Sequence, residues 1–296
     1  MQYHEPVLLK ETTENLNVKA GGRYIDATLG DGGHTLEILK RGGHVLGIDV
    51  NEDSLKRAEF RIEEAGLSES FKGILGNFKN IEEIGKENGF EKVNGIVYDL
   101  GYSSYELEES GLGLSFQADE PLDMRLSKSL GVTAADLLNS LNGKDIANLI
   151  YEYSGERLSG RIAREIVKAR SLKRIQTTKD LVEIINSVSS PGYERGRINP
   201  ATRTFQALRI AVNDEIENLK KSLPQAARLL LPGSVIVLIT FHSLEDKVAK
   251  EFGRRARPSI TEVYKKPLRP SKEEIEKNPR SRSAKLRVFK KIDKNA

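Results

Sequence analysis

The sequence predicts an α/β fold, in which a Rossmann-like parallel sheet carries an inserted all-α domain. Strand and helix signals alternate through roughly the first hundred residues, helical patterns alone fill the next stretch, and a strand signal returns only near residue 234. Strands that are joined by helices pair in parallel within one sheet. We therefore expect a discontinuous α/β domain, 1–106 plus 208–296, and a helical insertion, 107–207.

The predicted strands are short apolar or alternating runs bounded by turn residues such as Gly, Asn and Asp. This pattern is typical of strands that are buried in a parallel sheet. The segments with this pattern are 23–28, 45–50, 71–75, 93–100, 234–241 and 287–292.

Apolar residues three or four positions apart predict helices between these strands and throughout the insertion. A helix opens near Thr35, and further helices span 52–65, 133–139, 145–153, 159–169, 178–188 and 201–231. We expect Thr133 and Thr178 to be N-caps, and the helix 201–231 to break near Pro224. The stretch 254–282 holds four prolines and many charges, so we expect an extended arm there.

Composition excludes several classes of protein. The chain has no cysteine, which rules out disulfides, thiolate catalysis and cysteine-ligated zinc. No cluster of His, Asp and Glu has metal-ligand spacing, so we expect no metal. No apolar run approaches the roughly 20 residues of a membrane span, and no signal peptide is evident. We expect a cytoplasmic protein with no membrane partner; the sequence allows a homodimer.

The net charge of +4 is unevenly distributed. Residues 157–209 carry 12 Lys/Arg against 4 Asp/Glu, and residues 247–296 carry 17 against 6. Such segregation favours a face that binds a polyanion such as nucleic acid, although a solvated basic surface would have the same composition.

The strongest motif is D-A-T-L-G-D-G-G-H-T, from Asp26 to Thr35, between a predicted strand and a predicted helix. Glycines at this position let the backbone approach a ligand closely. A dinucleotide fingerprint requires a third glycine where Thr35 stands. Asp49 ends the next strand, and a carboxylate there accepts hydrogen bonds from both ribose hydroxyls of a nucleoside.

The charges of this loop help to discriminate between cofactors. Asp26 and Asp31 are poor neighbours for a pyrophosphate but suit a sulfonium ligand that carries an ammonium group. We therefore favour S-adenosylmethionine over NAD. A tight turn that binds no ligand is the simpler alternative.

Two further segments follow predicted strands. Asn77 and Phe78 offer a polar side chain and an aromatic face that would bracket an adenine, unless Phe78 is simply part of the core. Asp99-Leu100-Gly101-Tyr102 follows the fourth strand, where Asp99 would accept an N–H of an amine substrate and Tyr102 would supply a flat surface. Amino methyltransferases often carry Asp/Asn-Pro-Pro-aromatic at this place, so the match is partial.

The sequence resembles the RsmH (MraW) family along nearly its whole length. The stretches that carry the resemblance are His4-Glu5-Pro6-Val7, the loop from Asp26, G-I-D before Val50, D-L-G-Y-S-S from Asp99, E-P-L-D-M-R-L from Glu120, F-Q-A-L-R-I-A-V-N-D-E from Phe205, F-H-S-L-E-D from Phe241 and R-S-A-K-L-R from Arg282. The E-P-L-D-M-R and F-H-S-L-E-D stretches are not general methyltransferase features.

The resemblance implies a class I methyltransferase sheet and N4-methylation of a cytidine in the decoding region of small-subunit ribosomal RNA. Its partner would be that RNA or the assembled small ribosomal subunit. The family commonly has Gln seven positions after Asp99, where this chain has Glu106, which keeps the acceptor oxygens but loses the amide donor. The implied cofactor contacts are Gly32, Gly33, His34, Asp49, Phe78, Asp99 and, if the substitution preserves it, Glu106.

The E-P-L-D-M-R stretch is the candidate for shaping the acceptor pocket. Asp123 would accept a hydrogen bond from the exocyclic amine, and Arg125 would hold a phosphate or a buried carboxylate. The alternative is a structural Asp–Arg pair that locks the loop. His242 would either approach the base or cap the following helix.

For the reaction we expect direct displacement, with Asp99 and Asp123 as candidates to hold and then deprotonate the amine. The target base must be single-stranded or flipped out to reach a pocket. Arg161, Arg164 and Arg203 of the insertion are candidates for phosphate contacts.

The sequence leaves three alternatives open. A nicotinamide- or flavin-dependent oxidoreductase would use the same fold class, but the missing third glycine argues against it. A non-catalytic RNA-binding ribosome-assembly factor would retain the basic regions. A methyltransferase that acts on another nucleic acid or on a small molecule would retain the cofactor loop, although the basic regions disfavour a small molecule.

Overall fold

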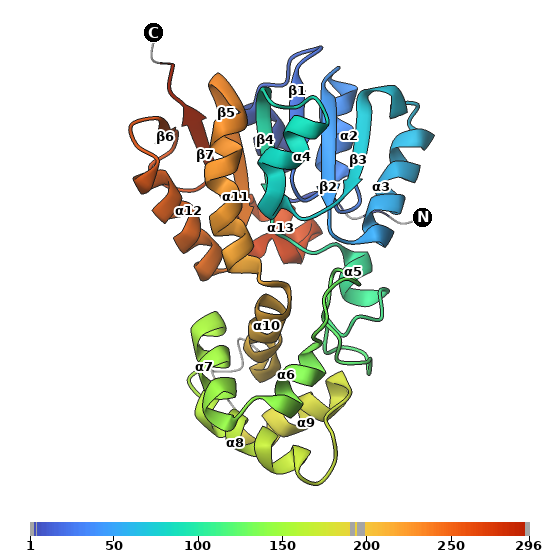
Figure 1. Ribbon diagram of the computed structural model, residues 1–296, viewed down its shortest axis with the longest axis vertical. Coiled ribbons are helices and arrows are strands. Elements are labelled where there is room, and N and C mark those ends of the chain that lie inside the picture. The colour runs from blue at the N-terminus through green and yellow to red at the C-terminus, as the bar shows by residue number, and fades with distance from the viewer. Residues whose placement is uncertain (1–2, 4, 190–192, 194–198, 294–296) are drawn as a thin grey trace. The chain divides into compact units, whose positions relative to one another are not determined.

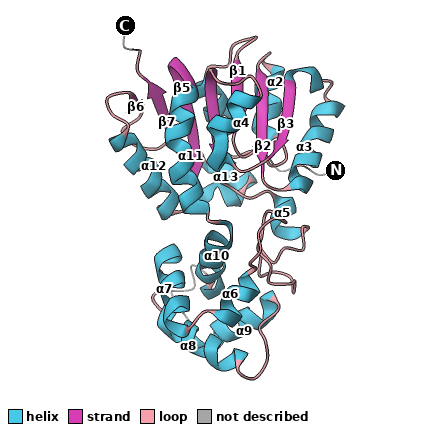
Figure 2. Ribbon diagram, in the orientation of Figure 1, coloured by secondary structure: helices cyan, strands magenta, loops and turns pink. Residues whose placement is uncertain are grey.

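The computed structural model describes residues 3, 5–189, 193 and 199–293. The chain divides into two compact units. One, the sheet unit, comprises Met1–Ser103 and Ile216–Ala296; the other, the helical unit, comprises Ser104–Glu215. Every strand of the described chain lies in the sheet unit (Figure 2).

The sheet has seven strands in the order β3-β2-β1-β4-β5-β7-β6. β1 to β5 pair in parallel, whereas β7 is antiparallel to both β5 and β6. The chain moves outward from β1 to β3 and then crosses to β4 on the other side of β1, so the topological switch lies between β1 and β4 (Figure 1). The α/β fold class is thus confirmed. The strands are β1 Arg23–Asp26, β2 His44–Asp49, β3 Phe71–Leu75, β4 Val93–Asp99, β5 Leu230–Thr240, β6 Ile260–Glu262 and β7 Lys285–Lys291.

Helices pack on both faces of this sheet, as parallel strands require. No helix of the described residues is long and apolar enough to cross a membrane. The helices of the sheet unit are α1 Leu9–Leu16, α2 Gly33–Lys40, α3 Glu52–Glu64, α4 Ile81–Glu87, α11 Glu215–Leu229 (which begins at the unit boundary), α12 Ser243–Arg255 and α13 Lys272–Lys277, with 3-10 turns at Ser68–Ser70, Phe78–Asn80 and Pro279–Ser283.

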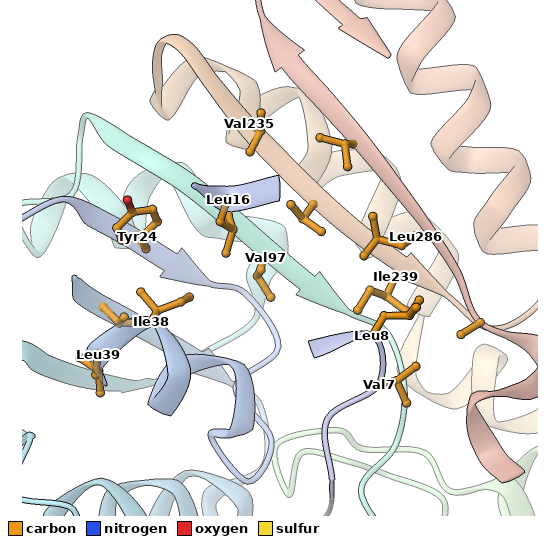
Figure 3. Packing of buried hydrophobic residues seen from close by; sticks show 14 of the residues in the cluster. Val7, Leu8, Leu16, Tyr24, Ile38, Leu39, Val97, Val235, Ile239 and Leu286 are labelled. Atoms are coloured by element: carbon orange, nitrogen blue, oxygen red, sulfur yellow. The ribbon is translucent and has the colours of Figure 1, made fainter. Parts of the chain in front are cut away.

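Alternate residues of each central strand face opposite layers of helices. Leu16 of α1 and Ile38 of α2 pack with Val97 and Ile239 in one buried cluster (Figure 3). Tyr98, the next residue after Val97, points to the other face and bonds α11. Both faces are therefore covered, and only the strand ends are left to form a site.

The helical unit begins most of its helices with side-chain caps. Thr133 accepts the Asp136 N–H, and Asp136 binds back to Thr133, as expected for a capping box. The cap of α9 is Thr177, not the predicted Thr178. The Thr178 hydroxyl instead donates to the carbonyl of Ala118 at 2.7 Å. The helices are α5 Ser104–Glu108, α6 Ala134–Ser140, α7 Gly143–Ser154, α8 Ser159–Arg170, α9 Thr178–Val188 and α10 Pro200–Asn213.

Two further predictions about local structure were wrong. The long helix breaks at Asp214, which has φ of 52°, and continues through Pro224 within α11. The stretch 254–282 is not an extended arm, because it contributes the end of α12, then β6 and α13. Glu274 of α13 also accepts the Leu8 N–H at 2.7 Å, which anchors the stretch to the N-terminal segment.

Candidate active site

The glycine loop between β1 and α2 is folded tightly against its surroundings. Gly30 and Gly32 have φ of 51° and 71°, which glycine adopts without strain. A Cβ on Gly33 would stand 2.2 Å from the Pro6 ring, and one on Gly32 would stand 3.1 Å from the Ala58 methyl group. A Cβ on Gly30 would meet no atom within 4 Å, so the open side of the loop is at Gly30.

Two carboxylates lie beside this loop at the ends of β1 and β2. Asp49 accepts the N–H groups of Gly30 and Asn51, each at 2.8 Å. Burial raises the pKa of Asp49 to about 6 against the opposing effect of these two donors. Burial also raises the pKa of Asp26, which accepts a hydrogen bond from the Thr35 hydroxyl at 2.8 Å.

Asp31, the acid inside the loop, does not offer its charge to a cationic ligand in the way that the sequence suggests. Asp31 is 6% exposed, and its carboxylate pairs with the Arg57 guanidinium of α3 at 2.8 and 3.2 Å. Arg61 donates to the Asp31 carbonyl, and the Tyr3 ring lies 4.6 Å from the Arg61 guanidinium. The charge of Asp31 is therefore balanced internally, so Asp26, Asp49 and Asp99, rather than Asp31, favour a cationic ligand.

The end of β4 places Asp99 against the first turn of α2. Its Oδ2 lies 3.2 Å from Nε2 of His34, and its Oδ1 accepts the Gly101 N–H at 3.1 Å. The Asp99 N–H donates to the Thr28 hydroxyl at 2.6 Å. The His34 side chain is 5% exposed, and its Nδ1 has no hydrogen-bond partner among the described residues. This fixed carboxylate lies at the topological switch, where open α/β sheets bind their ligands.

The third strand delivers an aromatic side chain to the same end of the sheet. Phe78 opens the 3-10 turn after β3, and Asn77 caps that turn by accepting the Lys79 N–H. The Phe78 ring is half-buried and meets the Tyr98 ring edge-on at 5.7 Å between centroids. Tyr102 of the D-L-G-Y turn is half-buried as well.

These residues fit S-adenosylmethionine. The carboxylates of Asp26, Asp49 and Asp99 accept hydrogen bonds from hydroxyl and ammonium donors and oppose a pyrophosphate. Open space adjoins Gly30, where a side chain would otherwise stand. Asp49 ends β2, and the half-buried Phe78 ring follows β3 at the same end of the sheet.

In the helical unit, the E-P-L-D-M-R stretch forms a locked loop. Arg125 binds Asp123 with two parallel hydrogen bonds, at 2.6 and 2.8 Å, and donates a third to the Leu130 carbonyl. Between them Met124 is fully buried and has φ of 63°, a conformation that costs a non-glycine residue energy. Asn213 at the end of α10 holds this turn, because its amide donates to the Met124 carbonyl at 2.8 Å and accepts the Leu126 N–H at 2.9 Å.

Three other candidate residues have internal partners. Arg203 lies 3.6 Å from the carboxylate of Glu156, which is 1% exposed. His242 is the N-cap of α12, and its Nε2 lies 2.9 Å from the Glu245 carboxylate. Glu106 of α5 is 8% exposed. These contacts give Arg203 and His242 structural roles.

The basic residues around α8 fall into two groups. Arg161 and Arg164 are exposed and have no ion-pair partner in the part of the chain that the structure describes. Lys173 and Arg174, just after α8, are paired with Asp180 and Asp136 at 3.1 and 2.8 Å. Of these four residues, Arg161 and Arg164 are thus the two that are available to an external anion.

Sequence reasoning missed the residues that hold the candidates in place. Thr28 lies inside the D-A-T-L-G-D-G-G-H-T motif and Asn213 inside the F-Q-A-L-R-I-A-V-N-D-E stretch, so membership of these motifs could have identified both residues. Arg57 lies outside every motif, and nothing in the sequence pairs it with Asp31, because 26 residues separate the two.

The comparisons with known proteins identify the family of the chain. The family model described as the MraW methylase family matches residues 1–292. A ribosomal RNA small subunit methyltransferase H from Carboxydothermus hydrogenoformans is 46% identical over 98% of both chains. A protein of the same name from Dictyoglomus thermophilum is 44% identical over 96% of this chain and 95% of its own.

The fold also resembles the crystal structure of an rRNA methylase from Streptococcus thermophilus. The TM-score is 0.47 at 11% identity, over 96% of this chain and 95% of the other, a likeness too weak to support an argument about function. The family match by itself confirms the expected methyltransferase activity and the S-adenosylmethionine cofactor. The chain belongs to the MraW methylase family.

Proposed function

We propose that this enzyme transfers a methyl group from S-adenosylmethionine to N4 of a cytidine in the decoding region of small-subunit ribosomal RNA. The observation that carries the chemistry is the Asp99 carboxylate, held by His34 and Gly101 at the end of β4. The names of the relatives, ribosomal RNA small subunit methyltransferase H, support the choice of RNA.

The cofactor, when bound, supplies a methyl group that is already activated by a sulfonium. Gly32, Gly33 and His34 of the loop, with Asp49 and Phe78, would hold it. The remaining task of the protein is to position the amine and to receive its proton. Each Asp99 oxygen already has one partner and retains a lone pair, so the carboxylate accepts an amine N–H without losing its anchors. Tyr102 would offer the base a flat surface.

Of the two candidate acids, Asp99 suits proton transfer better than Asp123. Both oxygens of Asp123 accept hydrogen bonds from the Arg125 guanidinium, which ties this carboxylate to its own loop rather than to an incoming amine. Asp123 and Arg125 together would instead present a rigid polar edge to the RNA. Their side chains are 24% and 28% exposed, so solvent-side atoms remain available for that contact.

We propose the helical unit as the RNA-recognition part of the enzyme. Arg161 and Arg164 would contact phosphates and contribute affinity but no sequence specificity. The cytoplasm, where ribosomal subunits are found in bacteria, is where we expect the enzyme to act, on the RNA or on the assembled small subunit.

The test is transfer of labelled methyl from S-adenosylmethionine to isolated small ribosomal subunits, naked ribosomal RNA and duplex DNA. Digestion to nucleosides then identifies the product. We expect the label in N4-methylated cytidine from the subunit or its RNA and none in DNA. Label in another nucleoside would refute the proposed acceptor atom, and label in DNA alone would refute the choice of RNA.

A further inference from the structure

A chain of hydrogen bonds inside the sheet unit ends at the main chain of Phe78. The Tyr98 hydroxyl lies 2.5 Å from the Ser222 hydroxyl, and the Ser222 hydroxyl donates to the Phe78 carbonyl at 2.8 Å. A serine hydroxyl has a single proton, so Tyr98 must be the donor in the first bond. Tyr98 and Ser222 are both fully buried, so water cannot replace either partner.

The same two elements, β4 and α11, also hold the turn after β3 by other contacts. The Tyr98 ring meets the Phe78 ring edge-on, at 80° between planes. One helical turn after Ser222, the Gln225 amide donates to the Lys79 carbonyl at 2.6 Å. Ser222 and Gln225 lie three positions apart and therefore on one face of α11. Strand β4 and helix α11 thus fix both the ring and the backbone of the turn.

We propose that Tyr98 and Ser222 are positioning residues for the cofactor, which act by holding Phe78 in the orientation that receives the adenine. This inference rests on the proposed function in one respect, that Phe78 contacts the adenine. Neither Tyr98 nor Ser222 touches the cofactor in this arrangement. A ring at the start of a short turn has few contacts of its own, so its orientation depends on the groups behind it.

The test compares S222A and Y98F with the wild-type chain for binding of S-adenosylhomocysteine by calorimetry. S222A removes the bond to Phe78 and leaves the Tyr98 hydroxyl without an acceptor, and we expect affinity to fall about tenfold, or about 1.4 kcal/mol. Y98F keeps the ring contact and the Ser222–Phe78 bond, and we expect a fall of about threefold. The KM for S-adenosylmethionine should rise in parallel while kcat at saturation stays unchanged.

Tyr24 provides a matched control. It is 1% exposed in the neighbouring strand β1, and its hydroxyl accepts the Lys19 N–H at 2.8 Å. Y24F therefore removes a buried, hydrogen-bonded hydroxyl from the same sheet without touching Phe78. We expect Y24F to destabilise the fold about as much as Y98F does and to leave S-adenosylhomocysteine affinity unchanged.

F78A separates failure of this inference from failure of the cofactor assignment. If F78A binds S-adenosylhomocysteine as tightly as the wild type, Phe78 does not contact the cofactor and the proposed site itself is wrong. If F78A weakens binding while S222A and Y98F do not, the site stands and the positioning role is refuted. Equal losses of affinity in Y98F and Y24F would also overturn the inference, because they would indicate a general effect of destabilisation.

Discussion

The contrast between free and paired basic residues around α8 gives a quantitative prediction for RNA binding. The double variant R161A/R164A removes two exposed guanidinium groups that have no ion-pair partner among the described residues. Each contact with a phosphate of single-stranded RNA contributes about 0.7 to the slope of log K against log salt. Loss of two contacts should therefore reduce that slope by about 1.4 and weaken binding about tenfold at 0.15 M salt.

The matched control is K173A/R174A, which removes the same charge from the adjoining segment. Lys173 and Arg174 already pair with Asp180 and Asp136, so we expect the salt slope of this variant to stay close to that of the wild type. The assay is fluorescence polarisation of a labelled fragment of small-subunit ribosomal RNA over a salt series. Equal changes of slope in the two double variants would refute the distinction between free and paired residues.

Three further predictions concern the cofactor loop and the locked loop. Affinity for S-adenosylhomocysteine should decline as the pH falls below about 6, because Asp49 becomes protonated there. D49N should bind S-adenosylhomocysteine weakly at every pH. A wild-type affinity that stays constant from pH 8 to 5 would contradict this assignment. R57A removes the guanidinium that pairs with the Asp31 carboxylate, and the two side chains are only 13% and 4% exposed. We expect the free energy of unfolding in urea to fall by about 3 kcal/mol; a loss below about 1 kcal/mol would show that the pair is dispensable. N213A removes two of the hydrogen bonds that hold the left-handed Met124 turn and should destabilise the chain by about 2 kcal/mol and hasten proteolysis there; unchanged stability would show that the remaining bonds suffice.

Grouping of the site acids could be predicted from the sequence. Asp26, Asp49 and Asp99 each end a short apolar run, and the carboxyl ends of parallel strands meet at one edge of a sheet. The pattern alone therefore predicts that the three lie together. The orientation of each side chain could not be predicted in the same way, because it depends on partners that are distant in the sequence. Asp31 shows this, since Arg57 turns its carboxylate into a buried ion pair.

The break in the long helix shows packing overriding a local signal. Pro224 lacks the N–H that an α-helix requires, which favours a break at that point. Leu223 and Ala226 beside it are fully buried, and their packing holds α11 together through the proline. The chain turns instead at Asp214, a residue type that tolerates left-handed φ better than most.

The stretch 254–282 could not be assigned because its partners lie at the other end of the chain. Glu274 binds Leu8, and the Tyr264 hydroxyl donates to Asn15 at 2.9 Å. These contacts join residues more than 240 positions apart. Composition alone indicates an extended segment, since prolines and charges disfavour packing, whereas specific hydrogen bonds of this kind leave no periodic trace in a sequence.

The most direct test of the account is the rate of N4-methylcytidine formation in a single turnover, at saturating S-adenosylmethionine and RNA. Asp99 is the proposed receiving carboxylate, whereas Asp123 is bound by its structural partner Arg125. We predict that D99N slows formation of the product by about a hundredfold or more, whereas D123N stays within about tenfold of the wild type. Product formation by D99N at the wild-type rate, or a greater loss in D123N, would contradict the account.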